Sequence, residues 1–302
     1  MTSHLTANAV FRVDGMVAVI TGGGTGIGLV MARALAENGA AKVYLLGRRL
    51  DVLQEVVKEY PSIFVPIQCD VTSKESLQAA VDAVTTQSGF VNLLVANSGV
   101  GGSAARWDPS YSISEARQKL FSESSMEDMT QTFHVNTTGA FFTLTAFLEL
   151  LDAGNKNAIE KGGFGAPYPG GKEPSVQSQV IFTASVASFS RHPLSNPSYA
   201  GSKAAIMHLT KHSASAMAQY GIRANALAPG LFPSDLAAGM IGSRKPDEEG
   251  PEDPRFIPAR RFGGDQDMAG TVLYLASHAG GFCNGTILLM DGGRAAVMPT
   301  SY

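Results

Sequence analysis

Apolar and polar positions alternate along the chain in blocks that repeat from near its start to near its end. Short runs rich in Val, Ile and Leu are apolar at nearly every position, which is typical of strands buried on both faces of a sheet. They cover residues 16–21, 42–46, 63–67, 91–96, 179–184, 222–227 and 285–290. Between these runs, apolar residues recur at helical spacing over residues 27–38, 50–59, 73–87, 125–151, 198–219 and 265–277.

This alternation of strands and helices predicts right-handed βαβ units. We therefore expect an α/β fold: a Rossmann-like, doubly wound parallel sheet of about seven strands with helices on both faces. The 302 residues contain neither an internal repeat nor a linker, so we expect a single domain over residues 1–302. Three segments break the pattern, namely the long loops 100–124 and 153–178 and the Pro-rich segment 231–262, which we predict to be a mobile lid over the substrate.

Composition excludes several classes of function. The formal net charge of −3 gives no basic footprint for nucleic acid and no polybasic patch for a membrane. The two cysteines, Cys69 and Cys283, lie far apart, and the histidines form no cluster with carboxylates, so we expect no metal site and no disulfide framework. No apolar run is long enough to span a bilayer, and the first residues lack the apolar core of a signal peptide. These features predict a cytoplasmic protein whose partner is a small molecule.

The first strand runs directly into the turn Thr21-Gly22-Gly23-Gly24-Thr25-Gly26-Ile27-Gly28, and a helix follows. Glycines allow the backbone to turn tightly there and to approach a pyrophosphate without a Cβ in the way. The start of the following helix then offers free N–H groups and a positive dipole end to the anion. A Gly-rich turn in this place predicts a dinucleotide site.

A second motif places Tyr199 and Lys203 four residues apart, on one face of a helix. Together with the spacing Gly22-x-x-x-Gly26-x-Gly28, it resembles the short-chain dehydrogenase/reductase family, over residues 14 to 293, and is similar to fungal secondary-metabolism reductases. The resemblance implies a catalytic set of Asn136, Ser185, Tyr199 and Lys203. The residues assigned to the cofactor are Gly22, Thr25, Gly26, Ile27, Gly28, Arg48, Arg49, Asp70, Val71, Asn97, Gly99, Tyr199, Lys203, Pro229, Gly230, Leu231 and Ser234.

The chain departs from the family pattern in two motifs. An Asn-Asn-Ala-Gly motif of the family stands here as Ala96-Asn97-Ser98-Gly99, so that only its second Asn and its Gly are kept. Ser234 stands where a Thr usually holds the nicotinamide carboxamide, and its hydroxyl can do the same. Neither change removes a group that cofactor binding requires, whereas the long segments 100–124 and 153–178 leave the substrate open.

Hydride transfer to a ketone requires a proton donor, and a free Tyr with a pKa near ~10 exchanges protons reluctantly at neutral pH. A neighbouring cation favours the phenolate, which Lys203 can supply. By resemblance, Lys203 also holds the nicotinamide ribose, Ser185 orients the carbonyl and Asn136 supports a water relay. Taken singly, each residue has a structural explanation. Tyr199 and Lys203 could reach to the surface, and Ser185 could be a strand-end hydroxyl. Asn136 could be a turn or helix former, and Asp70 a loop cap. Their joint order along the chain favours catalysis.

The end of the second strand distinguishes the two dinucleotides. Gly47 stands where an acidic residue would bind the ribose hydroxyls of NAD, and Arg48 and Arg49 follow. A guanidinium group can bind phosphate oxygens in a bidentate manner. We therefore expect NADP(H), with Arg48 as the principal contact and Arg49 largely in solvent.

These motifs together predict an NADPH-dependent oxidoreductase that reduces a ketone, hydrophobic or of β-ketoacyl type, to a secondary alcohol, reversibly. Two alternatives stay open: the same fold recruited for a non-redox step, such as a cyclase or isomerase, and a non-catalytic dinucleotide-sensing protein. Both would have no need of the intact Tyr199 and Lys203 pair. The resemblance also implies a homo-oligomer, a tetramer or dimer, formed through the helices at 125–151 and 198–219.

Overall fold

The structure is a computed structural model that describes residues 5–102 and 106–301. At its centre lies one sheet of seven strands in the order β3-β2-β1-β4-β5-β6-β7, and every neighbouring pair is parallel. The strands are β1 (Val17–Thr21), β2 (Lys42–Gly47), β3 (Phe64–Gln68), β4 (Leu93–Ala96), β5 (Gln179–Thr183), β6 (Arg223–Pro229) and β7 (Ile287–Met290). Each overlaps the run predicted for it, so the predicted α/β fold is confirmed.

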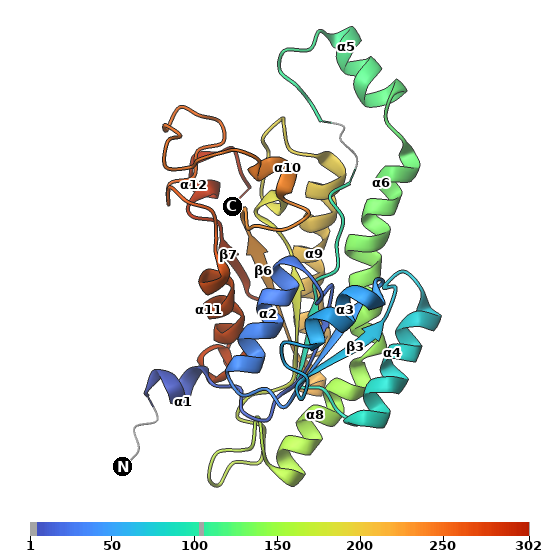
Figure 1. The fold of residues 1–302 in the computed structure, drawn as a ribbon, viewed down its shortest axis with the longest axis vertical. Coiled ribbons are helices and arrows are strands. Elements are labelled where there is room, and N and C mark those ends of the chain that lie inside the picture. Colours follow the sequence, from blue (N-terminus) through green and yellow to red (C-terminus); the bar gives the residue numbers. More distant parts are fainter. Residues whose placement is uncertain (1–4, 103–105, 302) are drawn as a thin grey trace.

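Helices cover both faces of the sheet (Figure 1). Successive side chains of β1 point to opposite faces: Ala18 and Ile20 enter one core, and Val17 and Val19 enter the other. The first core is covered by α2 (Gly26–Glu37), α3 (Leu50–Val57) and α11 (Asp265–Ala276). The second is covered by α4 (Lys74–Gln87), α7 (Ala140–Ala146), α8 (Leu148–Lys161) and α9 (Pro197–Ala216). Burial on both faces explains why the strands are apolar at nearly every position.

The helix predicted at 125–151 is divided in the structure. It begins as α6 (Met126–Phe133), widens into a π-helical turn over His134–Gly139, and continues as α7 and α8. Helix α8 ends only at Lys161, so residues 153–161 of the segment predicted to be a loop are helical. Gly154, Asn155 and Ala158 are buried in this extension, which packs it against the rest of the protein. Short helices also form at α1 (Ala7–Phe11), α5 (Ile113–Arg117), α10 (Ala238–Ile241) and α12 (Arg294–Val297).

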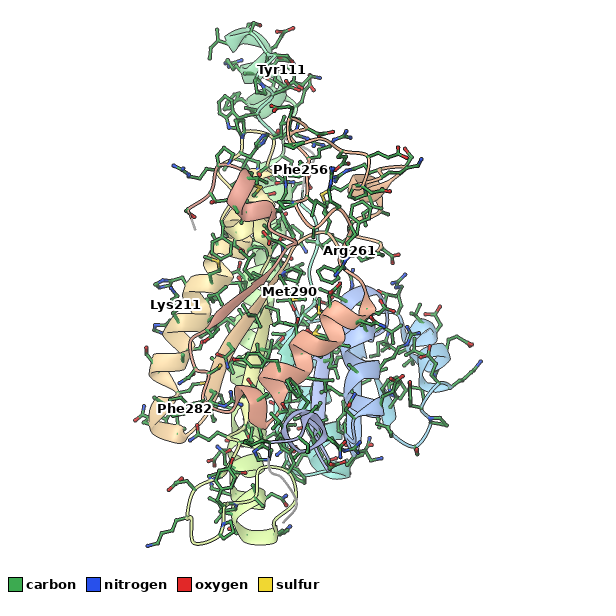
Figure 2. The ribbon with its side chains drawn as sticks, turned by 90° about the vertical axis from the view of Figure 1, so that its left-hand side faces the viewer. Tyr111, Lys211, Phe256, Arg261, Phe282 and Met290 are labelled. Atoms are coloured by element: carbon green, nitrogen blue, oxygen red, sulfur yellow. The ribbon has the colours of Figure 1, made fainter. Side chains whose placement is uncertain are left out.

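The segment 100–124 contains more regular structure than predicted, although residues 103–105 lie outside the described residues. A capping box of Ser112 and Glu115 starts α5, and a π-helical turn over Gln118–Ser122 follows it. Figure 1 shows α5 projecting beyond the body of the molecule, and Figure 2 shows Tyr111 at this far end. We call residues 106–124 the arm. Its side chains include Ile113 and Phe121, which are 85% and 73% exposed.

The segment 231–262 follows β6 and is mostly irregular apart from α10. It is nevertheless packed. Phe232 and Ile257 are buried, and Arg244 forms an ion pair with Glu249 whose two side chains are only 11% and 7% exposed. Over the part of the chain that the structure describes, no helix combines the length and the apolar character required to cross a bilayer.

Candidate active site

A cleft of about 520 Å³ opens at the carboxyl ends of the strands. The strand order reverses between β1 and β4, and ligands of open parallel sheets bind at such a point. The residues assigned to the cofactor that line the cleft are Gly22, Thr25, Arg48, Arg49, Asp70, Val71 and Gly99. The sequence analysis did not assign the other lining residues, which are Gly24, Gly47, Val52, Leu53, Cys69, Thr72, Ser98, Val100, Gln131 and Val135.

The glycine-rich turn has the shape that an anionic ligand requires. Gly22 lies in the left-handed region, with φ of 66°, and a Cβ on Gly28 would meet the carbonyl oxygen of Gly22 at 2.3 Å. The turn can therefore close only with glycine at both positions. The hydroxyl of Thr25 does not cap α2, and the first turn of α2 carries no acidic side chain. The start of α2 is thus open to a pyrophosphate.

Asn97 supports this turn from the neighbouring strand end. Its Nδ2 donates to the carbonyl oxygen of Thr21 at 3.0 Å, and its Oδ1 accepts from Thr183 Oγ1 at 3.1 Å. The hydroxyl of Thr21 accepts from the backbone N–H groups of Asn97 and Ser98 at 2.9 and 3.0 Å. The departure to Ala96 changes little, because that side chain is buried within β4.

The charged residues of the cleft lie where β2 and β3 end. Arg48 and Arg49 are both exposed, and Arg49 Nη2 lies 4.0 Å from Asp235 Oδ2, across from the start of the segment 231–262. Asp70 Oδ1 accepts from the N–H and the hydroxyl of Thr72 at 2.9 and 2.7 Å. These bonds, and the charge of Arg48, hold the pKa of Asp70 below its usual value. Asp70 therefore caps its own loop while it lines the cleft.

Of the residues assigned to the cofactor after β6, Ser234 adjoins the glycine-rich turn, whereas Gly230 and Leu231 have other neighbours. A Cβ on Gly26 would lie 3.0 Å from Ser234 Cβ, so Ser234 adjoins the glycine-rich turn. Gly230 has a different neighbour, because its Cβ would meet Asp291 Cα at 2.8 Å. Leu231 lines a separate cavity of about 260 Å³ together with the buried Phe232. Pro229 is the last residue of β6, and Ile27 lies in the first turn of α2.

The predicted Tyr199 and Lys203 pair lies in the first two turns of α9. Asn196 caps this helix and Pro197 occupies its first position, an arrangement that fixes where the helix begins. Lys203 is buried, its Nζ donates to the carbonyl oxygen of Thr183 at 2.7 Å, and it lies 5.9 Å from the centre of the Tyr199 ring. The helix thus brings phenol and amine together as its spacing predicts.

Ser185 follows β5 and meets Tyr199. Its hydroxyl accepts from the N–H of Ala187 at 3.1 Å. Burial raises the pKa of the Tyr199 phenol, and the neighbouring Ser185 side chain offsets part of that rise. Burial also lowers the pKa of Lys203 to about 8. Burial therefore dominates the phenol pKa in the protein alone, and the lowering of this pKa by Lys203 together with a bound nicotinamide stays a prediction.

Asn136 lies in the π-helical turn, a feature that often marks functional sites. Its Oδ1 accepts from the N–H of Val100 at 2.8 Å, and its Nδ2 donates to the carbonyl oxygen of Val100 at 3.0 Å. Nδ2 also donates to Ser202 Oγ at 3.0 Å. Asn136 thus joins the loop after β4 to α9, at the residue before Lys203.

Three supporting residues escaped the sequence analysis. Thr183 holds Lys203 through its backbone carbonyl, which leaves no side-chain signal in a sequence. Ser202 is fully buried, and its hydroxyl donates to the carbonyl oxygen of Tyr199 at 2.8 Å. Asn196 did carry a signal, because an Asn directly before Pro is a typical helix start.

These groups form a site suited to a carbonyl compound beside a nicotinamide. The side chain of Ser185 neighbours the phenol of Tyr199, and the amine of Lys203 lies 5.9 Å from the centre of the phenol ring. The glycine turn fits a dinucleotide, because a Cβ would fill the space between Gly22 and Gly28, and the open start of α2 suits its pyrophosphate.

Comparisons with known proteins show the family of the chain. Residues 16–159 match the short chain dehydrogenase family and residues 172–295 match the family described as enoyl-(acyl carrier protein) reductase. The short-chain dehydrogenase/reductase SAT3 of Stachybotrys chartarum is 57% identical over 90% of this chain and 100% of its own.

Two solved structures are also similar in fold. A 7α-hydroxysteroid dehydrogenase complexed with NADH and 7-oxo glycochenodeoxycholic acid has a TM-score of 0.74 and is 27% identical over 96% of this chain and 97% of its own. RhlG of Pseudomonas aeruginosa, in an NADP complex, has a TM-score of 0.72 and is 26% identical over 95% of this chain and 98% of its own. The chain belongs to the short-chain dehydrogenase/reductase family, whose members are oxidoreductases that bind NAD(P)H and act on CH–OH and C=O groups.

Proposed function

We propose that the protein uses NADPH to reduce a ketone, hydrophobic or of β-ketoacyl type, to a secondary alcohol, and that the reaction is reversible. The observation that carries this proposal is the grouping of Ser185, Tyr199 and the buried Lys203, whose Nζ lies 5.9 Å from the centre of the Tyr199 ring, beside the dinucleotide cleft. A site that only sensed a dinucleotide would have no need of a buried acid with an amine behind it.

In this mechanism Ser185 and Tyr199 bind the carbonyl oxygen through their hydroxyl hydrogens, so negative charge that develops there meets two donors. A nicotinamide dinucleotide held at the glycine-rich turn would supply the hydride. Tyr199 then gives its phenolic proton to the oxygen, and the resulting phenolate faces the ammonium of Lys203. Thr183 holds Lys203 Nζ at 2.7 Å, which keeps the charge within reach of the ring. We assign Asn136 to hold the loop over this site through Val100.

The preference for NADPH rests on Arg48. Its side chain is exposed at the rim of the cleft. The residue before it, Gly47, has no carboxylate that could bind the ribose hydroxyls of NAD. A guanidinium in that place can pair with a 2′-phosphate. Arg49 faces Asp235 instead, so we assign it a secondary role.

We propose further that residues 231–262 form the lid, and that it moves as a preformed unit. Within the segment Arg244 Nη2 donates to Arg255 O at 2.9 Å, and Arg294 of α12 joins the segment to that helix by donating from Nη1 to Phe256 O at 2.9 Å. The ring of Phe232 packs where a Cβ on Gly263 would lie, so the two ends of the segment are in contact. Figure 2 shows Phe256 and Arg261 on this segment.

The proposal places the enzyme in the cytoplasm as a homo-oligomer that pairs through α6 to α8 and α9. Support for the pairing comes from exposed residues on or beside these helices, which include Met129, Ile159 and Tyr220. The arm adds further exposed apolar side chains next to α6.

A panel of bulky ketones tests the proposed function, with NADPH or NADH oxidation followed by absorbance and products identified by mass spectrometry. The proposal predicts stoichiometric NADPH oxidation with formation of a secondary alcohol for at least one hydrophobic ketone. Conversion of a compound without any nicotinamide consumption would favour a cyclase or isomerase. Tight NADPH binding without turnover on any compound of the panel would favour the sensing role.

A further inference from the structure

Asn196 lies three residues before Tyr199 and uses both ends of its side-chain amide. Its Oδ1 accepts from the N–H groups of Ser198 and Tyr199 at 2.9 and 3.1 Å, and from Ser198 Oγ at 2.8 Å. Because those partners are donors, the Nδ2 end must face the other way, and it donates to the carbonyl oxygen of Gly101 at 3.2 Å. One side chain therefore joins the first turn of α9 to the loop after β4.

The loop lies unusually close to the helix at this junction. Gly102 has φ of 78°, and a Cβ there would meet Ser198 Oγ at 2.5 Å and Thr132 Oγ1 at 3.0 Å. A Cβ on Gly101 would in turn lie 3.2 Å from Leu236 Cδ1 of the segment 231–262. The start of α9 and the proposed lid therefore both lie against the loop after β4, close to the side chain of Asn196.

We infer that Asn196 is a positioning residue for Tyr199, one that fixes the start of the catalytic helix against the loop after β4. The expected effect on kinetics rests on the proposed function, whereas the contact between the start of α9 and the loop does not depend on it. The side-chain carbonyl sets where α9 begins, and the NH₂ group sets the distance from that beginning to Gly101. Since Tyr199 must meet a substrate held between helix and loop, loss of either end displaces the phenol from the carbonyl oxygen.

Two variants separate these ends. Asn196→Asp keeps the acceptor that caps α9 and removes the donor to Gly101. Asn196→Ser also caps a helix well, is neutral, and so separates the lost donor from the added charge. Asn196→Ala removes both ends.

The chain offers a matched control in Asn155. Its Oδ1 accepts from the N–H of Ser178 at 2.7 Å, and its Nδ2 donates to the carbonyl oxygen of Gly221 at 2.9 Å. These partners precede β5 and β6, at the opposite edge of the sheet from the cleft. Asn155→Asp therefore removes the same kind of donor far from Tyr199.

The test combines hydrogen exchange with kinetics on the full chain. In Asn196→Asp and Asn196→Ser we expect the amides of residues 100–102 to exchange faster while those of Ser198 and Tyr199 stay protected. With a reducible ketone, kcat should fall about 3- to 10-fold, the worth of one hydrogen bond, while the NADPH Kd stays within twofold. Asn196→Ala should lose both protections and more of kcat. Asn155→Asp should lower the thermal midpoint and leave the exchange of 100–102 and kcat unchanged.

Unchanged loop exchange in both donor-free variants overturns the inference, as does faster exchange with normal kcat. An equal fall of kcat in Asn155→Asp also overturns it, because the effect would then be general destabilisation. Failure of the proposed function looks different: the wild-type protein would oxidise no NADPH with any ketone, and the exchange data would still decide whether Asn196 holds the loop.

Discussion

At the scale of single residues, burial shifts the pKa values of two side chains in the site, Tyr199 and Lys203. Lys203 is the clearest case, because the protein encloses an amine whose partner is a neutral carbonyl oxygen, that of Thr183, and thereby lowers its pKa to about 8. A buried amine of this kind destabilises the fold while it is charged. A buried amine of this kind is a candidate functional group, and the proposed pairing with the Tyr199 phenolate gives it a role.

This burial predicts a pH-dependent stability. The folded-state pKa of Lys203 is about 8 and the unfolded-state value is 10.5, so the unfolded chain holds more protons between these values, and stability rises with pH across that window. Lys203→Met should therefore be about 2 kcal/mol more stable than the wild type at pH 7, after allowance for the lost hydrogen bond. The difference should shrink or reverse by pH 10. Denaturant unfolding at several pH values measures it.

Lys211→Met serves as the control, since Lys211 lies exposed on the same helix (Figure 2). Its effect on stability should be small and independent of pH. A difference between Lys203→Met and the wild type that stays constant from pH 7 to pH 10 would show that the amine is not buried as described.

Cofactor choice also belongs to single residues. Arg48→Asp should weaken NADPH binding by about 1.5–3 kcal/mol, the worth of a charge-assisted hydrogen bond, and leave NADH binding unchanged or improved. Arg49→Asp, the neighbouring control, should have a much smaller effect because Arg49 faces Asp235. Calorimetric titration with both dinucleotides measures this. Equal losses for NADPH and NADH in Arg48→Asp would mean that Arg48 is structural.

At the scale of elements, the segment 231–262 gives a sharp prediction. Glu249→Ala leaves the guanidinium of Arg244 buried without its carboxylate, which typically costs about 3–5 kcal/mol and here acts on the segment. We expect faster hydrogen exchange over 231–262, a raised KM for the ketone, and a smaller change in the exchange of β1 to β7. The exposed pair of Lys245 and Glu248 in the same segment provides the control: Glu248→Ala should change none of these.

Substrate and cofactor together should slow the exchange of 231–262 in the wild type if the segment closes over them. Identical exchange with and without ligands would remove the lid from the account, whatever the Glu249→Ala variant shows.

Elements also show where sequence reasoning succeeds and where it stops. The strands and α2, α4, α9 and α11 follow from periodicity because each buries an unbroken apolar run or face. The helical end of α8 could not be predicted, since its buried residues, Gly154, Asn155 and Ala158, form no apolar helical face in the sequence. The π-helical turn that carries Asn136 leaves no periodic signal, because it displaces the pattern by one residue only.

The candidate site divides in the same way. Glycine spacing and the Tyr199 and Lys203 pair locate the cleft, because these demands act within a few residues of one another. The contacts of Asn196 with Gly101, and of Ser202 with Asn136, join segments that are far apart in sequence. Only the folded chain brings them together. The effect of burial on the pKa of Tyr199 could not be predicted for the same reason, since desolvation depends on the whole surrounding structure.

At the scale of the whole molecule, the residues proposed for cofactor binding and catalysis lie at one end of the sheet, where the strands have their carboxyl ends. The glycine turn after β1, Arg48 after β2, Asp70 after β3 and Ser185 after β5 all follow carboxyl strand ends. At the opposite end of the sheet, where the strands begin, side chains such as that of Asn155 make structural hydrogen bonds. This division lets the loops and the arm vary without loss of the fold.

The proposed assembly is testable at this scale. The exposed apolar side chains beside α6, α8 and α9 predict that the protein sediments as a dimer or tetramer at micromolar concentration. Sedimentation equilibrium measures the mass directly. A charged replacement of an exposed apolar residue on this face, Ile159→Glu, should shift the mass downward, whereas Leu5→Glu, at the exposed N-terminal end, should not. A monomer in the wild type would contradict the assembly but not the chemistry.

The central claim is that Tyr199 donates the proton in an NADPH-dependent ketone reduction. The most direct test is the turnover of Tyr199→Phe on a ketone that the wild type reduces, with Tyr220→Phe, an exposed tyrosine, as the control. Turnover should fall by about 10²- to 10⁴-fold, the usual worth of a positioned acid, with the fold and the NADPH Kd retained. Normal turnover in Tyr199→Phe would contradict the claim.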